Sequence, residues 1–184
     1  MNIVHRIKQF IAAIQAELYP EDVEFIRKHL TKQEQILFYR MPTVDQCHSL
    51  NVAYRLQNKI REVELRQHQP INMREEAVIA ALLHDVGKVE APFSLPARIL
   101  YVVARKLFYN LGLKYIIEKG EKSDASKLFR NFYVLEYHPL IGAHLLEQIN
   151  VNPDSVTMIA KHQEDINLAE PLVFNLLKEA DEDI

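Results

Sequence analysis

The sequence predicts an all-α protein that forms a single domain. Glycine is scarce, with 4 residues in 184, and the alternating Val, Ile and Thr patterns that indicate strands are rare. Apolar residues instead recur three and four positions apart, as on the buried face of a helix. With 48% apolar and 26% charged residues, the composition is ordinary for a globular domain, and this length can enclose one sizeable core.

The first part of the chain predicts short helices. Apolar residues recur with helical spacing from the N-terminus, and a second helix begins at Pro20. Thr31, with Glu34 three positions later, has the pattern of a capping box and predicts the start of a third helix. We expect this N-terminal helical extension, residues 1–42, to pack on a main domain that spans residues 43–184.

Two apolar segments predict the centre of the main domain. Apolar residues from 44 to 60 mark one face of a helix that starts at Pro42 and ends near Gln67. The next helix, which Asn72 caps, is apolar on all sides over residues 77–83. A helix without a polar face is expected to be buried, so this helix is predicted to be central.

The second half of the chain predicts further helices that glycine and proline separate. Pro139 divides two of them, because proline inside a helix removes a hydrogen bond and clashes with the preceding turn. The helices expected here cover residues 95–117 with an interruption at Gly112, then 123–135, 138–148, 153–162 and 171–181.

His84-Asp85, at the end of the apolar helix, is the most informative motif. Gly87 follows, where it is placed for a left-handed turn that ends the helix, and Lys88 comes next. His and carboxylate side chains bind divalent transition metals. The carbonyl groups exposed at a helix end also favour a nearby cation. The pair therefore predicts a metal site at this helix end.

Four more residues extend the pair to a set of six candidate ligands. They come from different predicted helices, which is how helical bundles build buried metal sites. The set is His48, His84, Asp85, His138, His162 and Asp181. Taken alone, a histidine is more often a surface or core residue than a ligand, and Asp181 is one of several acidic residues near the C-terminus.

Together these motifs resemble the HD-domain superfamily of metal-dependent phosphohydrolases. The similarity rests on five segments, namely His48–Ala53, His84–Lys88, His138–Ala143, His162–Glu164 and Ala180–Asp181. It implies an HD-type helical bundle with one metal on His48, His84, Asp85 and Asp181. It also implies a second metal on His138 and His162, with Asp85 bridging the two ions and Lys88 facing the substrate phosphate.

Two departures from the superfamily pattern narrow the range of expected substrates. Its two-metal cyclic-dinucleotide phosphodiesterases have a second histidine where Gln163 stands, and a Gly-Tyr-Pro loop shortly afterwards. Residues 164–169 of this chain read Glu-Asp-Ile-Asn-Leu-Ala. The sequence is therefore not expected to belong to the subfamily that hydrolyses cyclic di-GMP.

The resemblance implies hydrolysis of a phosphoester on a nucleotide or another small phosphorylated metabolite. We expect Asp85 and Lys88 to be the catalytic residues and one or two divalent ions (iron, manganese, magnesium or another metal) to be the cofactor. A di-iron oxygenase of the same fold is an alternative, because His and carboxylate ligands suit iron as well as manganese. A non-catalytic signalling module is another, although all six ligand positions are filled.

Charge and hydropathy argue against a nucleic-acid-binding protein and a membrane protein. The net charge is −3, and a local basic segment at residues 98–130 has eight Lys or Arg against three Asp or Glu. A generally basic nucleic-acid binder has an excess of Lys and Arg over the whole domain, whereas this chain has a negative net charge. No stable nucleic-acid binding is therefore expected. The unbroken apolar stretch at residues 99–104 is too short to span a bilayer, and the apolar segment around it is expected to be buried rather than lipid-bound. Cys47, the single cysteine, cannot form an internal disulfide, so a cytoplasmic protein is expected. No membrane contact is expected, because the apolar stretches are short. Its oligomeric state is not predicted.

Overall fold

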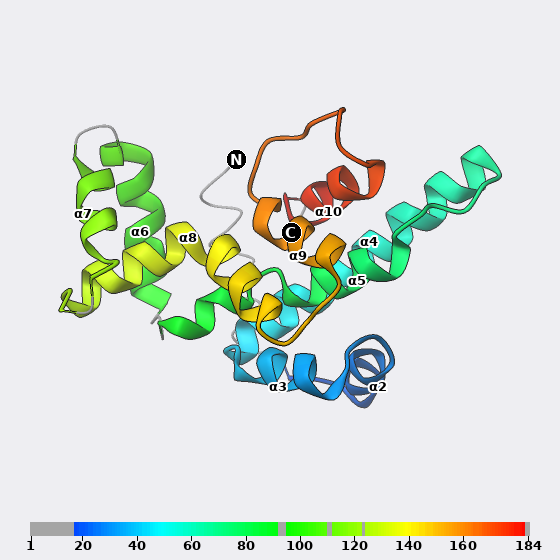
Figure 1. The fold of residues 1–184 in the computed structure, drawn as a ribbon, viewed down its shortest axis with the longest axis horizontal. Coiled ribbons are helices and arrows are strands. Elements are labelled where there is room, and N and C mark those ends of the chain that lie inside the picture. The colour runs from blue at the N-terminus through cyan, green and yellow to red at the C-terminus, as the bar shows by residue number, and fades with distance from the viewer. Residues whose placement is uncertain (1–16, 92–94, 110–111, 123, 183–184) are drawn as a thin grey trace.

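The computed structural model describes residues 17–91, 95–109, 112–122 and 124–182, and these residues form helices and no strands (Figure 1). The all-α prediction is confirmed. The first predicted helix lies mostly outside the described residues. The elements are α2 (Pro20–His29), α3 (Lys32–Arg40), α4 (Thr43–Gln67), α5 (Arg74–Leu83), the 3₁₀ helix η1 (Val86–Glu90), α6 (Leu95–Phe108), α7 (Leu113–Lys119), α8 (Lys127–Glu147), α9 (Pro153–Lys161) and α10 (Leu172–Glu182).

Local capping signals placed several helix starts correctly. Pro20 is the first residue of α2. The Thr31 hydroxyl accepts the Glu34 N–H at 3.4 Å, and the Glu34 carboxylate accepts the Thr31 N–H at 2.6 Å, which completes the predicted capping box of α3. Asn152 caps α9 by accepting the Asp154 N–H at 2.8 Å.

Other predicted boundaries are wrong. Met73, with a left-handed φ of 62°, is the N-cap of α5 in place of Asn72. Ser126 caps α8, so this helix begins later than residue 123. Pro139 lies inside α8, which runs on without a break. Gly87 lies in η1 without the positive φ of a left-handed turn; Gly112 is the glycine with positive φ in the described residues.

α5 is the central helix, as its apolar sequence predicted. It packs against α2, α3, α4, α9 and α10. Ala77, Leu82 and Leu83 are fully buried in the main core, which also includes Ile26 of α2 and Phe38 of α3. The two N-terminal helices therefore share this core, while the division at residue 42 stays a prediction.

A second, smaller core joins α6 and α7 to the first half of α8. Its buried residues are Tyr101, Leu113, Ile117, Phe132 and Leu135. In Figure 1, α6 and α7 stand side by side at one end of the molecule, beyond the main core. The expected burial of the whole apolar segment is wrong, because α6 leaves about half of the side-chain surface of Leu100, Leu107 and Phe108 exposed. Every helix of the described residues is too short or too polar to span a lipid bilayer.

Candidate metal site

The structure brings all six predicted ligands into one cluster, at the point where segments distant in sequence meet. His48 lies in α4, His84 and Asp85 link α5 to η1, His138 is in the middle of α8, His162 ends α9 and Asp181 lies near the end of α10. The Nε2 atom of His48 is 3.0 Å from Asp181 Oδ1 and 3.2 Å from His84 Nε2. His138 Nε2 is 3.2 Å from Asp85 Oδ1.

Three overlapping groups within the cluster could each hold a metal ion. In each group the ligand atoms lie within 4.8 Å of one another. The groups are His48, His84 and Asp85; His84, His162 and Asp181; and Asp85, His138 and His162. Asp85 belongs to two of them, and its Oδ1 faces His138 while its Oδ2 lies 3.9 Å from His48 Nε2. This carboxylate can therefore serve two neighbouring ions.

Three of the histidines are oriented by the same local device. His84, His138 and His162 each place Nδ1 on the carbonyl oxygen three residues earlier, at 2.9, 2.9 and 2.7 Å. Because a carbonyl oxygen only accepts, Nδ1 carries the proton in each ring. The lone pair is then on Nε2, which points into the cluster. A partner of this kind fixes the tautomer and ring orientation of metal-binding histidines.

His162 supplies the strongest test of whether the residues fit a metal. Its Nε2 atom is buried and has no hydrogen-bond partner among the described residues. The rings of His84 and His138 lie 5.0 and 5.3 Å away, centroid to centroid. Burial, and then the proximity of these two rings, lower the pKa of His162 to about 3. A neutral, unpartnered imidazole in a polar cluster fits a metal ligand and would be costly otherwise.

The two carboxylates are held in the ionised form that a metal requires. Burial alone would raise the pKa of Asp85, but Lys88, His84 and His138 hold it well below its ordinary value. Burial opposes ionisation of Asp181 as well, and the hydrogen bond from His48 keeps its pKa low. These donors, imidazole nitrogen and carboxylate oxygen, suit iron, manganese or zinc.

Two cationic side chains lie beside Asp85. Lys88 Nζ is 2.5 Å from Asp85 Oδ2. Arg98, from the start of α6, makes a bidentate pair with buried Asp45 at 2.5 and 2.6 Å. Burial opposes the charge of Arg98, but the hydrogen bonds and charge of Asp45, and then the charge of Asp85, raise its pKa above the ordinary value. Asp45 lies one turn before His48 in α4. This pair could not be predicted, because neither residue belongs to a motif and their contact joins segments 53 residues apart.

Gln163 is a further neighbour of the cluster and is not one of the six predicted ligands. Its Nε2 atom lies 3.2 Å from His138 Nε2. Sequence reasoning treated this position only as a departure from a related subfamily. The hydrogen-bonding capacity of a glutamine directly after His162 was the available signal.

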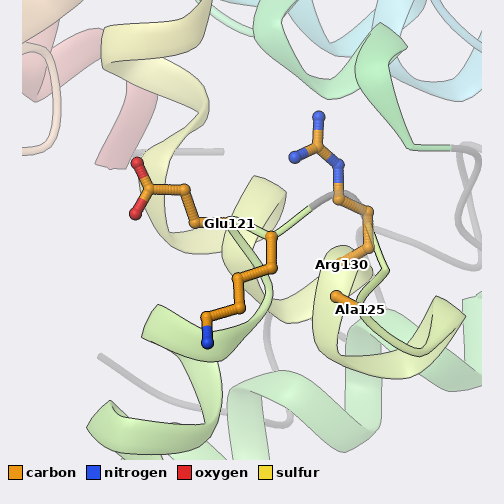
Figure 2. Close-up of a pocket in the computed structure, with 4 residues that line it drawn as sticks. Glu121, Ala125 and Arg130 are labelled. Carbon is orange, nitrogen blue, oxygen red and sulfur yellow. The ribbon is translucent and has the colours of Figure 1, made fainter.

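A surface hollow lies away from the cluster, between the end of α7 and the start of α8 (Figure 2). Its volume is about 370 Å³, and Glu121, Lys122, Ala125 and Arg130 line it. None of the six candidate ligands contributes to it, and its lining side chains are exposed or partly exposed. The hollow therefore offers no chemistry comparable to the buried cluster.

Comparison with known proteins identifies the family. A family model described as HD domain matches residues 46–183, which is most of the chain and includes all six candidate ligands. No curated protein and no solved structure gives a significant match. The chain therefore belongs to the HD domain family, a superfamily of metal-dependent phosphohydrolases.

Proposed function

We propose that this protein is a metal-dependent phosphohydrolase that acts on a nucleotide or another small phosphoester. The observation that carries the proposal is the convergence of four histidines and two aspartates around the buried, unpartnered Nε2 of His162. A buried polar atom without a partner is costly, so its retention at the centre of a ligand cluster favours a bound cation.

Asp85 belongs to both of the proposed ligand sets. His48, His84, Asp85 and Asp181 would hold one ion, and Asp85, His138 and His162 would hold a second. When bound, a divalent ion supplies an acidified water and positive charge for the phosphoryl oxygens. The carbonyl bonds of the histidines keep their rings in the orientation that this chemistry needs.

Lys88 and Arg98 supply positive charge for an anionic substrate. Lys88 neutralises Asp85 Oδ2 in the present structure. With a divalent ion held by Asp85, the ammonium group of Lys88 would be available to bind a phosphoryl oxygen from the side of η1. Arg98 stays on Asp45 and adds a fixed positive charge at the edge of the cluster.

The first experiment measures metal content per chain after purification without chelators, followed by hydrolysis assays on nucleotides and p-nitrophenyl esters with manganese, magnesium or ferrous iron. We expect bound metal and metal-dependent phosphate release. Asp85→Ala should abolish both, whereas the exposed Asp154→Ala should change neither. Full activity of Asp85→Ala would contradict the mechanism, and oxygen uptake by the ferrous protein without phosphate release would favour an oxygenase.

A further inference from the structure

We infer that Gln163 is a further ligand of the ion held by Asp85, His138 and His162, and that it binds through its amide oxygen. The inference rests on the proposed metal site and deepens it. Nothing in the six-residue pattern assigns a role to Gln163.

The contact with His138 places the amide at the ligand atom itself. His138 Nδ1 donates to the Leu135 carbonyl, so its Nε2 carries the lone pair. Gln163 Nε2 donates to that lone pair at 3.2 Å. His138 is almost fully buried and Gln163 is exposed, so the amide approaches the cluster from its solvent side.

With a metal ion on His138 Nε2, the Gln163 amide would have to present its oxygen in place of its N–H. An ion on His138 Nε2 takes the lone pair, and the amide N–H would then point its positive end at a cation. Rotation of the terminal amide torsion, which has a broad two-fold profile, exchanges the nitrogen for the oxygen. An amide oxygen is a neutral ligand that suits manganese or magnesium. The three protein ligands of this group leave room for it, because divalent ions take four to six ligands.

The segment that follows Gln163 is fixed to the helix that carries Asp181. Lys178 of α10 donates to the Asp165 carbonyl at 3.1 Å and to Glu170 at 2.8 Å. Asn175 and Asn167 exchange two hydrogen bonds at 2.9 and 3.0 Å. Gln163 thus sits between the anchored end of α9 and an anchored loop, within reach of the cluster.

Manganese titration of the full chain, after removal of metal with a chelator, tests the inference. Bound manganese is counted by mass spectrometry and followed by electron paramagnetic resonance, which reports coupling between two ions. The variants are Gln163→Leu, which removes both polar atoms, and Gln163→Glu, which keeps an oxygen and removes the N–H donor. Gln148→Leu is the matched control, because Gln148 makes the same amide–imidazole contact to His144 at 3.0 Å on the exposed face of α8.

We expect the original chain to bind two ions and Gln163→Leu to bind the second at least about tenfold more weakly, with the first unchanged. Gln163→Glu, whose carboxylate oxygen can take the place of the amide oxygen, should keep the second ion. Gln148→Leu should match the original chain. Unchanged binding of the second ion by Gln163→Leu, or a single ion at saturation in the original chain, would overturn the inference. Two coupled ions without phosphoester hydrolysis would contradict the proposed function and leave the role of Gln163 standing, whereas no bound ion would end both.

Discussion

Pro139 supplies no N–H to the carbonyl of Leu135, and His138 donates its Nδ1–H to that same carbonyl at 2.9 Å. In a regular helix this oxygen would accept from the residue four positions later. The proline therefore sits inside α8 next to a polar group that the ring of His138 satisfies. His84 and His162 use the same i−3 carbonyl bond where α5 and α9 end, and the proline provides an equivalent site in mid-helix.

Pro139→Ala should weaken metal binding while the fold persists. The alanine N–H competes with His138 for the Leu135 carbonyl, so the ring loses part of its orientation. We expect affinity for the ion on His138 to fall by about tenfold or more, as for other partners of metal ligands. Thermal stability should hold or rise, because proline in a helix interior costs about 3 kcal/mol. Calorimetry with and without manganese measures both, and unchanged affinity would contradict this role.

Gly87→Ala should destabilise the protein by forcing η1 away from α8. A Cβ atom at Gly87 would lie 2.1 Å from the His138 carbonyl oxygen and 2.7 Å from the Gly142 nitrogen, both backbone atoms. Overpacking costs about 1–3 kcal/mol or more, and this contact cannot be relieved by a side-chain rotation. Urea unfolding measures the loss. The comparison is Gly112→Ala, where a Cβ meets nothing within 4 Å and only the φ of 109° is strained; an equal or larger loss there would refute the packing argument.

Asp45→Asn should lower stability more than the loss of any surface pair. Asp45 is buried, with 3% of its side chain exposed, and its partner Arg98 keeps 12% of its side chain exposed. Removing one partner of a buried ion pair costs about 3–5 kcal/mol, because the remaining charge loses its closest partner. Glu62→Gln, which breaks an exposed pair with Arg66 in α4, should cost less than about 0.5 kcal/mol. Equal shifts of the two denaturation midpoints would show that Arg98 finds other compensation.

His162→Leu should separate a metal ligand from an ordinary core histidine. Leucine removes the buried, unpartnered Nε2 atom, whose burial costs about 1–3 kcal/mol. In the presence of a chelator we expect the variant to be as stable as the original chain or more stable. In the presence of manganese the original chain should gain stability by mass action and the variant should gain less. Reduced stability of the variant in chelator would indicate a structural histidine.

The candidate metal ligands could be predicted from the sequence, because His and Asp are the residue types that bind metals. His48, His84, Asp85, His138, His162 and Asp181 were predicted as one set, and the structure brings them together, although their binding of metal stays a prediction. Helix starts that depend on a nearby cap, such as Thr31 and Asn152, were also predictable.

Residues whose role depends on a distant segment were not predictable. Gly87 is explained by the approach of α8 and not by a local turn. Pro139 continues a helix because an imidazole satisfies the freed carbonyl. Asp45 and Gln163 acquire a role only through Arg98 and His138, which come from other helices. Sequence spacing reports local geometry and contains no direct record of such contacts.

Because α6 and α7 pack on a separate, smaller core, we expect this part of the protein to unfold more easily than the main core. Five buried residues hold this unit together, and Tyr101 and Arg105 tie it to Glu136 of α8, whereas α5 is enclosed on all sides. Subglobal opening needs less free energy where fewer apolar contacts must be broken. We therefore expect the α6–α7 pair to open more readily than the ligand-bearing helices, and this opening must also break the pair that Arg98 makes with Asp45 of α4. Amide hydrogen exchange should accordingly be faster in α6 and α7 than in α5.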